Sequence, residues 1–346
     1  MHAQTNRPLI SVVIPNYDGA RFLETCLQSL IRQTYPRVEI LVVDNSSRDS
    51  SIEIVRRIAP QARILQLESN LGFAAAVNRG VQAASGEWIA VLNNDTEAAP
   101  AWLSECAAAI SRHPEASFLA CRILDFQQRD RIFSAGDCFL RAGIGYRRGQ
   151  EQADSDQFQQ EIPIFAACGC AALYRKTVIE QANGYDEQFF AYLEDVELGL
   201  RLQASGMRGY YIPSAIVYHV GSGTSGGEFA PFAVRLRTRN AILLLIKSVP
   251  GRILRRTWRM ILFGQAFWFG RAIVHGRLLS YLRGWLGVFP ILPAMLEQRR
   301  RRKQILEEEG ERLYQSILES ESLARREFGS SASHPSLFLA WYFRLF

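Results

Sequence analysis

Residues 10–44 read ISVVIPNYDGARFLETCLQSLIRQTYPRVEILVVD, and this stretch decides the class of fold. It begins and ends with short, β-branched and almost wholly apolar runs, residues 10–14 and 38–43, which are typical of buried parallel strands. Between these runs, apolar residues recur at helical spacing at Phe22, Cys26 and Leu30. Strand–helix–strand order predicts a parallel sheet joined by right-handed crossovers.

The same alternation continues to about residue 115. Further strands are predicted at 63–67 and 88–92, and further helices around 54–58 and 73–84. Each predicted strand is followed by a polar segment: PNYDG at 15–19, DNSS at 44–47, ESNLGF at 68–73 and NNDT at 93–96. Ligands bind at the carboxyl ends of parallel strands, so these segments predict a polar ligand site, although turns favour the same residue types.

The second part of the chain is less regular. Strands are predicted near 117–123, 170–174, 209–212 and 215–220, and a helix from about Glu194. The Gly-, Gln- and Asp-rich segment 143–161 predicts an exposed loop, and GSGTSGG at 221–227 predicts a flexible one. From about residue 235 the pattern is helical, and residues 304–328 predict a charged, solvated helix.

The composition is that of a globular protein, with 346 residues, 48% hydrophobic and 21% charged, which excludes a mainly disordered or fibrous chain. The six cysteines form no paired C-x-x-C pattern, which argues against a structural zinc site. The charge is uneven. Residues 235–303 hold 16 Lys and Arg and one acid, Glu297, so their charge of +15 leaves −9 for the rest of a chain whose total is +6.

Two apolar runs in this basic segment, 260–270 and 284–296, are shorter than the roughly 20 residues that span a bilayer. They predict either buried core helices or segments that lie on a membrane, and the surrounding arginines favour the membrane. Nucleic-acid binding is another interpretation of a basic segment, but long apolar runs that contain tryptophan argue against it.

Two features could hold a divalent metal ion. Asp95 ends the segment Asn93-Asn94-Asp95 after a buried strand, where its carboxylate could bind Mg²⁺ or Mn²⁺. The structural alternative is an Asx turn, or the cap of a helix over residues 98–110. His219 ends an apolar strand and could be a structural histidine or a metal ligand.

Glu194 and Asp195 open the predicted helix, after a segment rich in aromatic residues. Acids in a first helical turn suit the helix dipole, which is a purely structural explanation. The alternative is a general base that is placed on a rigid helix start near the ligand edge. Partial burial among aromatic side chains would raise the proton affinity of such a carboxylate.

The sequence strongly resembles the family 2 glycosyltransferases over roughly residues 9–250, and within them the bacterial rhamnosyltransferase-like branch. Seven motifs carry the resemblance in the family's order: SVVIPNYDG, VVDNSS, NLGFAAAVNRG, VLNNDT, GCAALYR, GYDEQFFAYLEDVELGLRL and VYHVGS. The resemblance implies an α/β protein of the GT-A type, a Rossmann-like mixed sheet flanked by helices, here with a basic and apolar helical extension at its C-terminal end. It also implies transfer of a sugar from a nucleotide diphosphate donor to an acceptor hydroxyl, with inversion at the anomeric carbon.

The resemblance further implies roles for single residues. The donor would be bound by Pro15, Asn16, Tyr17, Asp44, Gly72, Asn78, Asn93, Asn94 and Asp95. Asp95 and His219 would hold Mg²⁺ or Mn²⁺, and Asp195 would be the catalytic base with Glu194 beside it. Asn93 departs from the family, which has an acid at this position, and the lost charge should weaken metal affinity. Val77 is a second departure, because many relatives have an arginine there.

Two rival functions fit the residues less well. A dehydrogenase should show G-x-G-x-x-G after its first strand, where this chain has Pro15-Asn16-Tyr17-Asp18-Gly19. A catalytically inactive glycan-binding relative has no need of both Asp95 and Asp195, and the chain has both.

The expected organisation is a catalytic domain over 1–234, with a donor-binding half at about 9–115 and an acceptor half at about 116–234. Residues 235–303 would be basic amphipathic helices that associate with an anionic membrane surface, and 304–346 a charged helix and an aromatic tail. The tail, 335–346, could be an interfacial anchor or a partner-binding strand. Removal of residues 251–346 is expected to release the protein from membranes.

The expected partners are a nucleotide-sugar donor and a glycan or lipid-linked acceptor, with no nucleic acid. The branch favours L-rhamnose from dTDP-L-rhamnose, while glucose, galactose or galactofuranose from a UDP donor is the alternative. The N-terminus shows no signal-peptide pattern. We therefore expect a cytoplasmic protein that is peripheral on the inner face of the cytoplasmic membrane.

Overall fold

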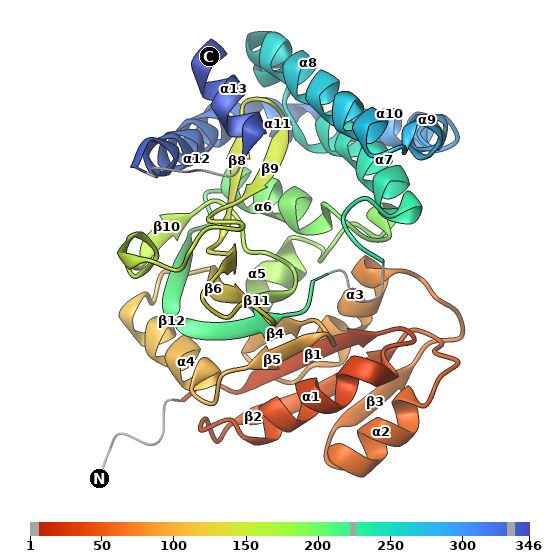
Figure 1. Cartoon of the computed structure of the whole chain (residues 1–346), viewed down its shortest axis with the longest axis vertical. Helices are drawn as coiled ribbons and strands as arrows, with labels where there is room; N and C mark the ends of the chain where they lie inside the picture. The colour runs from red at the N-terminus through yellow and green to blue at the C-terminus, as the bar shows by residue number, and fades with distance from the viewer. Residues whose placement is uncertain (1–6, 222–225, 331–335) are drawn as a thin grey trace.

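The computed structural model describes residues 7–221, 226–330 and 336–346. Its centre is a mixed sheet in the order β10-β12-β6-β11-β4-β1-β2-β3 (Figure 1). These strands are β1 (Ile10–Asn16), β2 (Val38–Asp44), β3 (Arg63–Gln66), β4 (Trp88–Leu92), β6 (Phe118–Asp125), β10 (Ile162–Ile164), β11 (Ala171–Arg175) and β12 (Gly209–His219). Strands β3, β2, β1 and β4 run parallel, and β11 is antiparallel to both β4 and β6. The predicted α/β class and the predicted strand order of the first half are confirmed.

Helices pack on both faces of the sheet. They are α1 (Ala20–Ile31), α2 (Ser51–Ile58), α3 (Phe73–Ala83), α4 (Trp102–Arg112), α5 (Lys176–Gln181) and α6 (Glu194–Ala204). On β1, Val13 belongs to one apolar cluster, while Val12 and Ile14 belong to another. Because both faces of the strand are buried, its sequence is continuously apolar instead of alternating.

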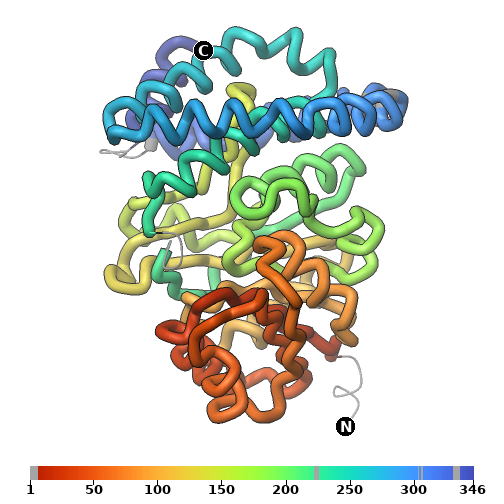
Figure 2. Tube along the Cα trace, turned by 90° about the vertical axis from the view of Figure 1, so that its right-hand side faces the viewer, coloured from red at the N-terminus to blue at the C-terminus, as the bar shows by residue number. Residues whose placement is uncertain are grey.

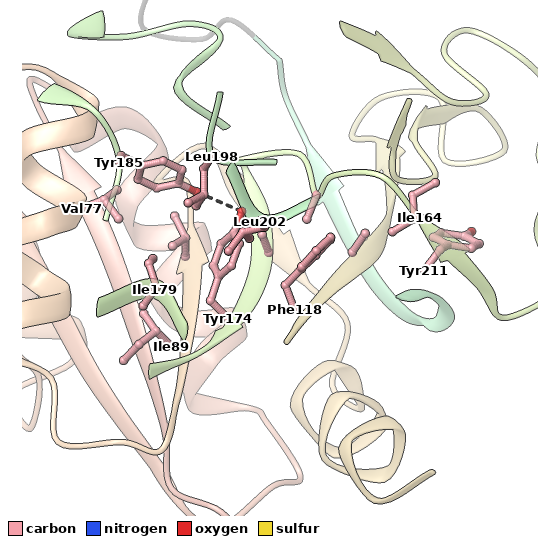
Figure 3. Close-up of a cluster of buried hydrophobic side chains, with 14 of the residues drawn as sticks. Val77, Ile89, Phe118, Ile164, Tyr174, Ile179, Tyr185, Leu198, Leu202 and Tyr211 are labelled. Atoms are coloured by element: carbon pink, nitrogen blue, oxygen red, sulfur yellow. Dashed lines mark hydrogen bonds between the residues drawn. The ribbon is translucent and has the colours of Figure 1, made fainter. Parts of the chain in front are cut away.

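The cluster that contains Val13 fixes α6 against the sheet. Figure 3 shows Leu198 and Leu202 of α6 beside Tyr174 of β11, whose hydroxyl lies 3.4 Å from that of Tyr185. All four side chains are buried. This packing sets the position of the first turn of α6, which begins at Glu194.

The C-terminal helices form a layer at the end of the molecule opposite β1, β2 and β3 (Figures 1 and 2). They are α7 (Pro231–Ser248), α8 (Gly251–Val274), α9 (Leu278–Leu286), α10 (Leu292–Arg301), α11 (Lys303–Glu308), α12 (Gly310–Ser330) and α13 (Leu337–Leu345). Within the described ranges, none of these helices combines the length and the apolar character that crossing a bilayer requires.

The prediction of an exposed loop over 143–161 holds only in part, because several residues between 151 and 160 are exposed but the start of the segment is a strand. Residues Asp137–Leu140 (β8) and Ile144–Arg147 (β9) form an antiparallel hairpin, and a 3-10 turn follows at Asp156–Phe158. Arg148 is 2% exposed, because its guanidinium donates to the Ala135 carbonyl and forms an ion pair with Glu327 of α12. Polar residues are buried here because each finds a partner, which composition alone does not reveal.

The helix predicted over 98–110 begins later, at Trp102, because residues Thr96–Ala98 form β5 instead. β5 pairs with the end of β12, antiparallel, with Thr96 opposite His219. The cap interpretation of Asp95 is therefore wrong. The strands predicted at 209–212 and 215–220 are one strand, β12, with a shift in register between Ile212 and Ile216. Most of the predicted flexible segment 221–227 lies outside the described residues.

The C-terminal predictions need two corrections. The helix predicted over 304–328 is solvated on one face only, since Leu313, Ile317 and Glu321 of α12 are buried. The aromatic tail is a helix, α13, so the alternative of a partner-binding strand is wrong. The Tyr342 hydroxyl of α13 donates to Glu321 at 2.7 Å. This contact ties the end of the chain to α12.

Candidate active site

One cavity of about 910 Å³ lies at the carboxyl ends of β1 and β4. Its floor comes from the polar segments that follow these strands, and its far wall from α8 and α13. It brings together most of the predicted site residues, namely Pro15, Asn16, Tyr17, Gly72, Asn93, Asn94, Asp95, Glu194, Asp195 and His219. The predicted ligand edge of the sheet and the predicted helix start therefore face the same space.

Asp95 and His219 form a buried pair in this cavity. β5 follows Asp95 directly and pairs with β12, and the Val220 N–H donates to the Asp95 carbonyl at 3.0 Å. As a result, the His219 Nε2 lies 3.1 Å from the Asp95 carboxylate, and both residues are about 95% buried, at 4% and 5% exposure. The edge of the His219 ring meets the Phe133 ring, with the centroids 4.5 Å apart.

The donor set around this pair fits a divalent cation. Two buried polar atoms next to it, the Asn93 Oδ1 and the His219 Nδ1, have no hydrogen-bond partner among the described residues. Buried polar atoms are normally satisfied, so such atoms indicate a ligand or an ion. A carboxylate oxygen and an imidazole nitrogen that lie 3.1 Å apart can contact one ion at metal–ligand distances of about 2.0–2.2 Å.

Glu194 and Asp195 reach the cavity through an unusual turn. Phe190, Tyr192 and Leu193 all have positive backbone φ angles, between 64° and 71°, which residues other than glycine rarely adopt. Asn240 of α7 holds this turn, because its buried amide donates to the carbonyls of Phe189, Ala191 and Tyr192 at 2.7–2.9 Å. Asn240 was missed by sequence reasoning. The available signal was a single amide between the basic segment 235–239 and the apolar run 241–246.

Asp195 is oriented by backbone donors. Its Oδ2 accepts a hydrogen bond from the Gly169 N–H at 2.8 Å, and its Oδ1 accepts one from the Val196 N–H at 2.8 Å. Burial raises the pKa of Asp195, while these backbone hydrogen bonds lower it by a smaller amount. The result is a fixed carboxylate with more proton affinity than an exposed aspartate.

Asp137 of β8 is a second functional candidate that sequence reasoning missed. It is 3% exposed, and its Oδ1 accepts a hydrogen bond from the Ser134 hydroxyl at 3.0 Å. Single ligand atoms of Asp137, Cys168 and Asp195 lie within 4.8 Å of one another. Burial and the nearby charge of Asp195 raise the pKa of Asp137 well above its usual range. The available signal was one acid directly before the short apolar run CFL at 138–140.

Glu194 differs from Asp195 in its surroundings. It is 5% exposed, and its Oε2 has no hydrogen-bond partner among the described residues. Burial and the charge of Asp195 raise the pKa of Glu194 well above the usual carboxyl range. The neutral form of Glu194 is therefore favoured to a higher pH than that of an exposed glutamate, whereas Asp195 has the backbone donors that an ionised carboxylate needs.

Residues 11–182 match the model of the family described as glycosyl transferase family 2. A relative from Mycobacterium tuberculosis (strain H37Rv), an N-acetylglucosaminyl-diphospho-decaprenol L-rhamnosyltransferase, is 30% identical over 251 residues, which cover 64% of this chain and 78% of the relative. The chain belongs to glycosyl transferase family 2. The expectation from the sequence motifs is confirmed.

Solved structures agree with the fold of this family 2 transferase. GalNAc-T7, with UDP, GalNAc and Mn²⁺, matches with a TM-score of 0.60 at 16% identity, over 84% of this chain and 58% of the other. Staphylococcus aureus TarS 1-349, in complex with UDP-GlcNAc, matches with a TM-score of 0.54 at 15% identity, over 92% of both chains. The GT-A type of the predicted fold is confirmed.

Two predicted donor-binding residues of the transferase do not line the cavity. Asn78 is a correction: its amide donates to the Tyr185 carbonyl at 2.8 Å and accepts from the Tyr185 N–H at 2.8 Å. These bonds occupy the amide in tying α3 to the segment before α6. Asp44 is 2% exposed and accepts from Asn16 and from the Ser47 N–H, so it lies behind Asn16 as seen from the cavity. Its contact with a nucleobase stays a prediction.

Gly72 lies where the chain passes close to the turn before α6. Its φ angle is +89°, and an added Cβ would lie 2.5 Å from the Phe190 carbonyl oxygen. Only glycine allows this approach. Gly72 therefore sets the distance between the donor edge of the sheet and the acids of α6.

Proposed function

We propose that this chain is an inverting glycosyltransferase that moves L-rhamnose from dTDP-L-rhamnose to a hydroxyl of a glycan or lipid-linked glycan in cell-envelope polysaccharide synthesis. One observation carries the proposal: the oriented carboxylate of Asp195 faces the same cavity as the Asp95–His219 pair. The name of the mycobacterial relative supports the choice of sugar and of a lipid-linked acceptor.

In the proposed reaction, Asp195 acts as the general base. The acceptor hydroxyl oxygen attacks the anomeric carbon, its proton passes to the Asp195 carboxylate, and the bond from the anomeric carbon to the diphosphate oxygen breaks. A general base of this kind contributes about 10²–10⁴-fold to the rate. The Gly169 N–H keeps the carboxylate in place, and its partial desolvation raises its proton affinity.

Asp95 and His219 would hold Mg²⁺ or Mn²⁺, with the Asn93 amide oxygen beside them. Such an ion supplies charge stabilisation for the departing diphosphate. The Mn²⁺ in the GalNAc-T7 structure supports a divalent ion in this fold. Asn93 contributes an amide where the resemblance leads one to expect an acid, so the affinity for the ion should be modest.

A UDP-sugar donor, with glucose, galactose or galactofuranose, is the second candidate, because TarS with the same fold was solved with UDP-GlcNAc. Transfer assays should therefore compare dTDP-L-rhamnose, UDP-glucose, UDP-galactose and UDP-galactofuranose, each with Mg²⁺, Mn²⁺ or EDTA, on a lipid-linked glycan acceptor. Metal-dependent release of dTDP with rhamnose on the acceptor is expected. Release of UDP alone selects the second candidate, and an absence of transfer and of donor binding would contradict both.

We also propose that residues 235–303 and the aromatic tail hold the enzyme on the inner face of the cytoplasmic membrane, and that residues 1–234 form the catalytic domain, whose cavity is completed by side chains of α7, α8 and α13. Support comes from large apolar side chains that are 55–79% exposed on these helices: Trp258, Leu262, Val274, Leu279, Leu286, Phe289, Leu337, Trp341 and Leu345. Apolar side chains next to arginines are typical of helices that lie in a membrane interface.

A further inference from the structure

Three arginines face the cavity of the transferase beyond Asp137 and Asp195. They come from three elements: Arg147 ends β9, Arg237 lies in the second turn of α7, and Arg271 lies in the last turn of α8. Each guanidinium lies over an aromatic ring: Arg147 is 4.5 Å from the centroid of Phe133, Arg237 is 5.3 Å from that of Tyr192, and Arg271 is 4.9 Å from that of Phe229. Contact with the ring limits the movement of each guanidinium, and the N–H groups of a guanidinium can still bind an anion.

The charge of this cluster is only partly balanced. Glu228 is the carboxylate that the arginines share: Arg237 forms an ion pair with it at 2.7 Å, and Arg237, Arg147 and Arg271 together hold its pKa below the usual range. Among the described residues, Arg147 and Arg271 form no ion pair with a carboxylate within 4.0 Å. Three cations and one anion leave an excess of two positive charges.

The cluster lies between the catalytic acids and an apolar wall. Arg147 also lowers the pKa of both Asp137 and Asp195, so it lies near the carboxylates at one end of the cluster. Arg271 belongs to α8, whose Phe267 and Trp268 line the same cavity together with Phe338 of α13. One cavity thus presents a base, a cationic zone and an aromatic zone.

We propose that Arg147, Arg237 and Arg271 form a diphosphate-binding subsite for the acceptor, which Glu228 occupies in the free enzyme. The inference rests on the proposed function, because it assumes that the acceptor hydroxyl is activated at Asp195. A diphosphate that links a sugar to an apolar chain carries two negative charges, which match the two excess positive charges, and guanidinium groups bind phosphate oxygens with paired N–H donors. An acceptor with a sugar, a diphosphate and an apolar chain, in that order, would match the three zones of the cavity.

The first test titrates inorganic diphosphate into the full-length protein in EDTA, which keeps divalent cations away from Asp95 and His219. We expect Arg147→Gln and Arg271→Gln each to weaken the Kd about tenfold, and Glu228→Gln to tighten it several-fold, because a competing anion is lost. Arg259→Gln is the matched control, since Arg259 also lies over an aromatic ring, 5.4 Å from that of Trp258, but does not line the cavity. Equal Kd values for the wild type, the two arginine variants and the control would overturn the subsite.

The second test separates the two sources of a diphosphate. If the acceptor is the source, Arg271→Gln raises the KM for a diphosphate-linked acceptor about tenfold and leaves the Kd for dTDP with Mg²⁺ unchanged. If the Kd for dTDP rises by the same factor, the arginines bind the donor, and the assignment to the acceptor is wrong. The EDTA titration needs no turnover, so it stays informative even if the wild type transfers no sugar. The subsite and the proposed function can therefore fail separately.

Discussion

The carboxyl groups of Asp137 and Asp195 lie within 4.8 Å of each other, although one belongs to β8 and the other to α6. Asp137 is buried and Asp195 is partly buried, and desolvation raises the pKa of each; the charge of Asp195 raises that of Asp137 further. Arg147 opposes this rise at both groups, and Glu194, Cys168 and Cys170 are the other titratable neighbours. Two carboxylates at this distance resist simultaneous ionisation, so the pair holds one proton over a wide pH range.

The variant Asp137→Asn is therefore predicted to move the acid limb of the kcat/KM profile to lower pH. Asn removes the negative charge that disfavours ionisation of Asp195, so Asp195 becomes a competent base at a more acidic pH. The measurement is kcat/KM from pH 4 to 9. Asp130→Asn, a change in a surface turn that does not line the cavity, is the control. An acid limb that stays in place in Asp137→Asn would show that the two carboxyls do not interact.

The same pair predicts how stability changes with pH. A carboxyl whose folded pKa is raised binds more protons in the folded than in the unfolded state, so the free energy of unfolding falls as pH rises above the ordinary Asp pKa of about 4. Asp137 alone contributes a slope of at most about 1.4 kcal/mol per pH unit. Asp137→Asn should be more stable than the wild type at neutral pH and should lose part of this slope in urea titrations. If the free energy of unfolding falls more steeply with pH in Asp137→Asn than in the wild type, the predicted direction of the Asp137 contribution is wrong.

Asp195 and Glu194 are predicted to respond differently to removal of charge. Asp195→Asn should lower kcat by about 10²-fold or more while donor binding persists, because the base is lost but the donor contacts remain. Glu194→Gln should keep kcat within a fewfold, since the raised pKa of Glu194 favours its neutral form and Gln has the same shape. Single-turnover transfer and donor titration measure both effects. If Glu194→Gln shows the larger loss, Glu194 is the base instead of Asp195.

The sheet was predictable because its strands are buried on both faces. Residues 88–92 read WIAVL, and β4 has these same bounds, since a short apolar run between turns has few alternatives. Asp95, Asp195 and His219 were placed in one site by their positions at strand and helix ends and by their motifs. Their meeting depends on β5, which the sequence did not predict, because a three-residue strand has no periodicity.

The hairpin of β8 and β9 was not predictable for a different reason. Its polar residues, Arg148 above all, are buried by partners such as Glu327, which lies far away in the sequence. The polar composition of this segment predicts that its side chains are exposed to solvent. Arg148 is buried nonetheless, because it forms an ion pair with a residue that is distant in the sequence. Asp137 and Arg147 lie in the same hairpin. Because the hairpin was not predicted, neither of these two neighbours of Asp195 was predicted as a site residue.

Metal affinity should respond to residue 93. Asn93→Asp restores a carboxylate beside Asp95, where the buried Asn93 Oδ1 now has no partner among the described residues. A hard divalent cation gains one charged oxygen ligand, so Mn²⁺ should bind about tenfold or more tightly in calorimetric titrations. Asn94→Asp is not expected to have the same effect, because the Asn94 amide donates to the Asn16 Oδ1 at 2.7 Å and an aspartate would lose this hydrogen bond. An unchanged Mn²⁺ affinity in Asn93→Asp would place the ion elsewhere.

Deletion of residues 251–346 would not test membrane binding cleanly. The Ser320 hydroxyl of α12 accepts from the Phe139 N–H at 2.8 Å, and the Glu321 carboxylate accepts from the Arg141 N–H at 2.9 Å. Both bonds support the hairpin that carries Asp137. Loss of α12 would thus disturb the active site itself. Point substitutions of the exposed apolar side chains test membrane binding without this effect.

The double variant Leu286→Ser/Phe289→Ser should bind anionic vesicles about tenfold or more weakly than the wild type. Both side chains are more than 60% exposed, and each loses about 1.5–3 kcal/mol of potential transfer free energy when made polar. Ile31→Ser is the matched control, because Ile31 is 48% exposed on α1, at the opposite end of the molecule (Figure 1). Cosedimentation with vesicles at low and at high salt separates the apolar from the electrostatic part of the interaction, since salt weakens the attraction between the arginines and anionic lipids. Equal sedimentation of both variants, or no vesicle binding by the wild type, would place the C-terminal helices away from the membrane.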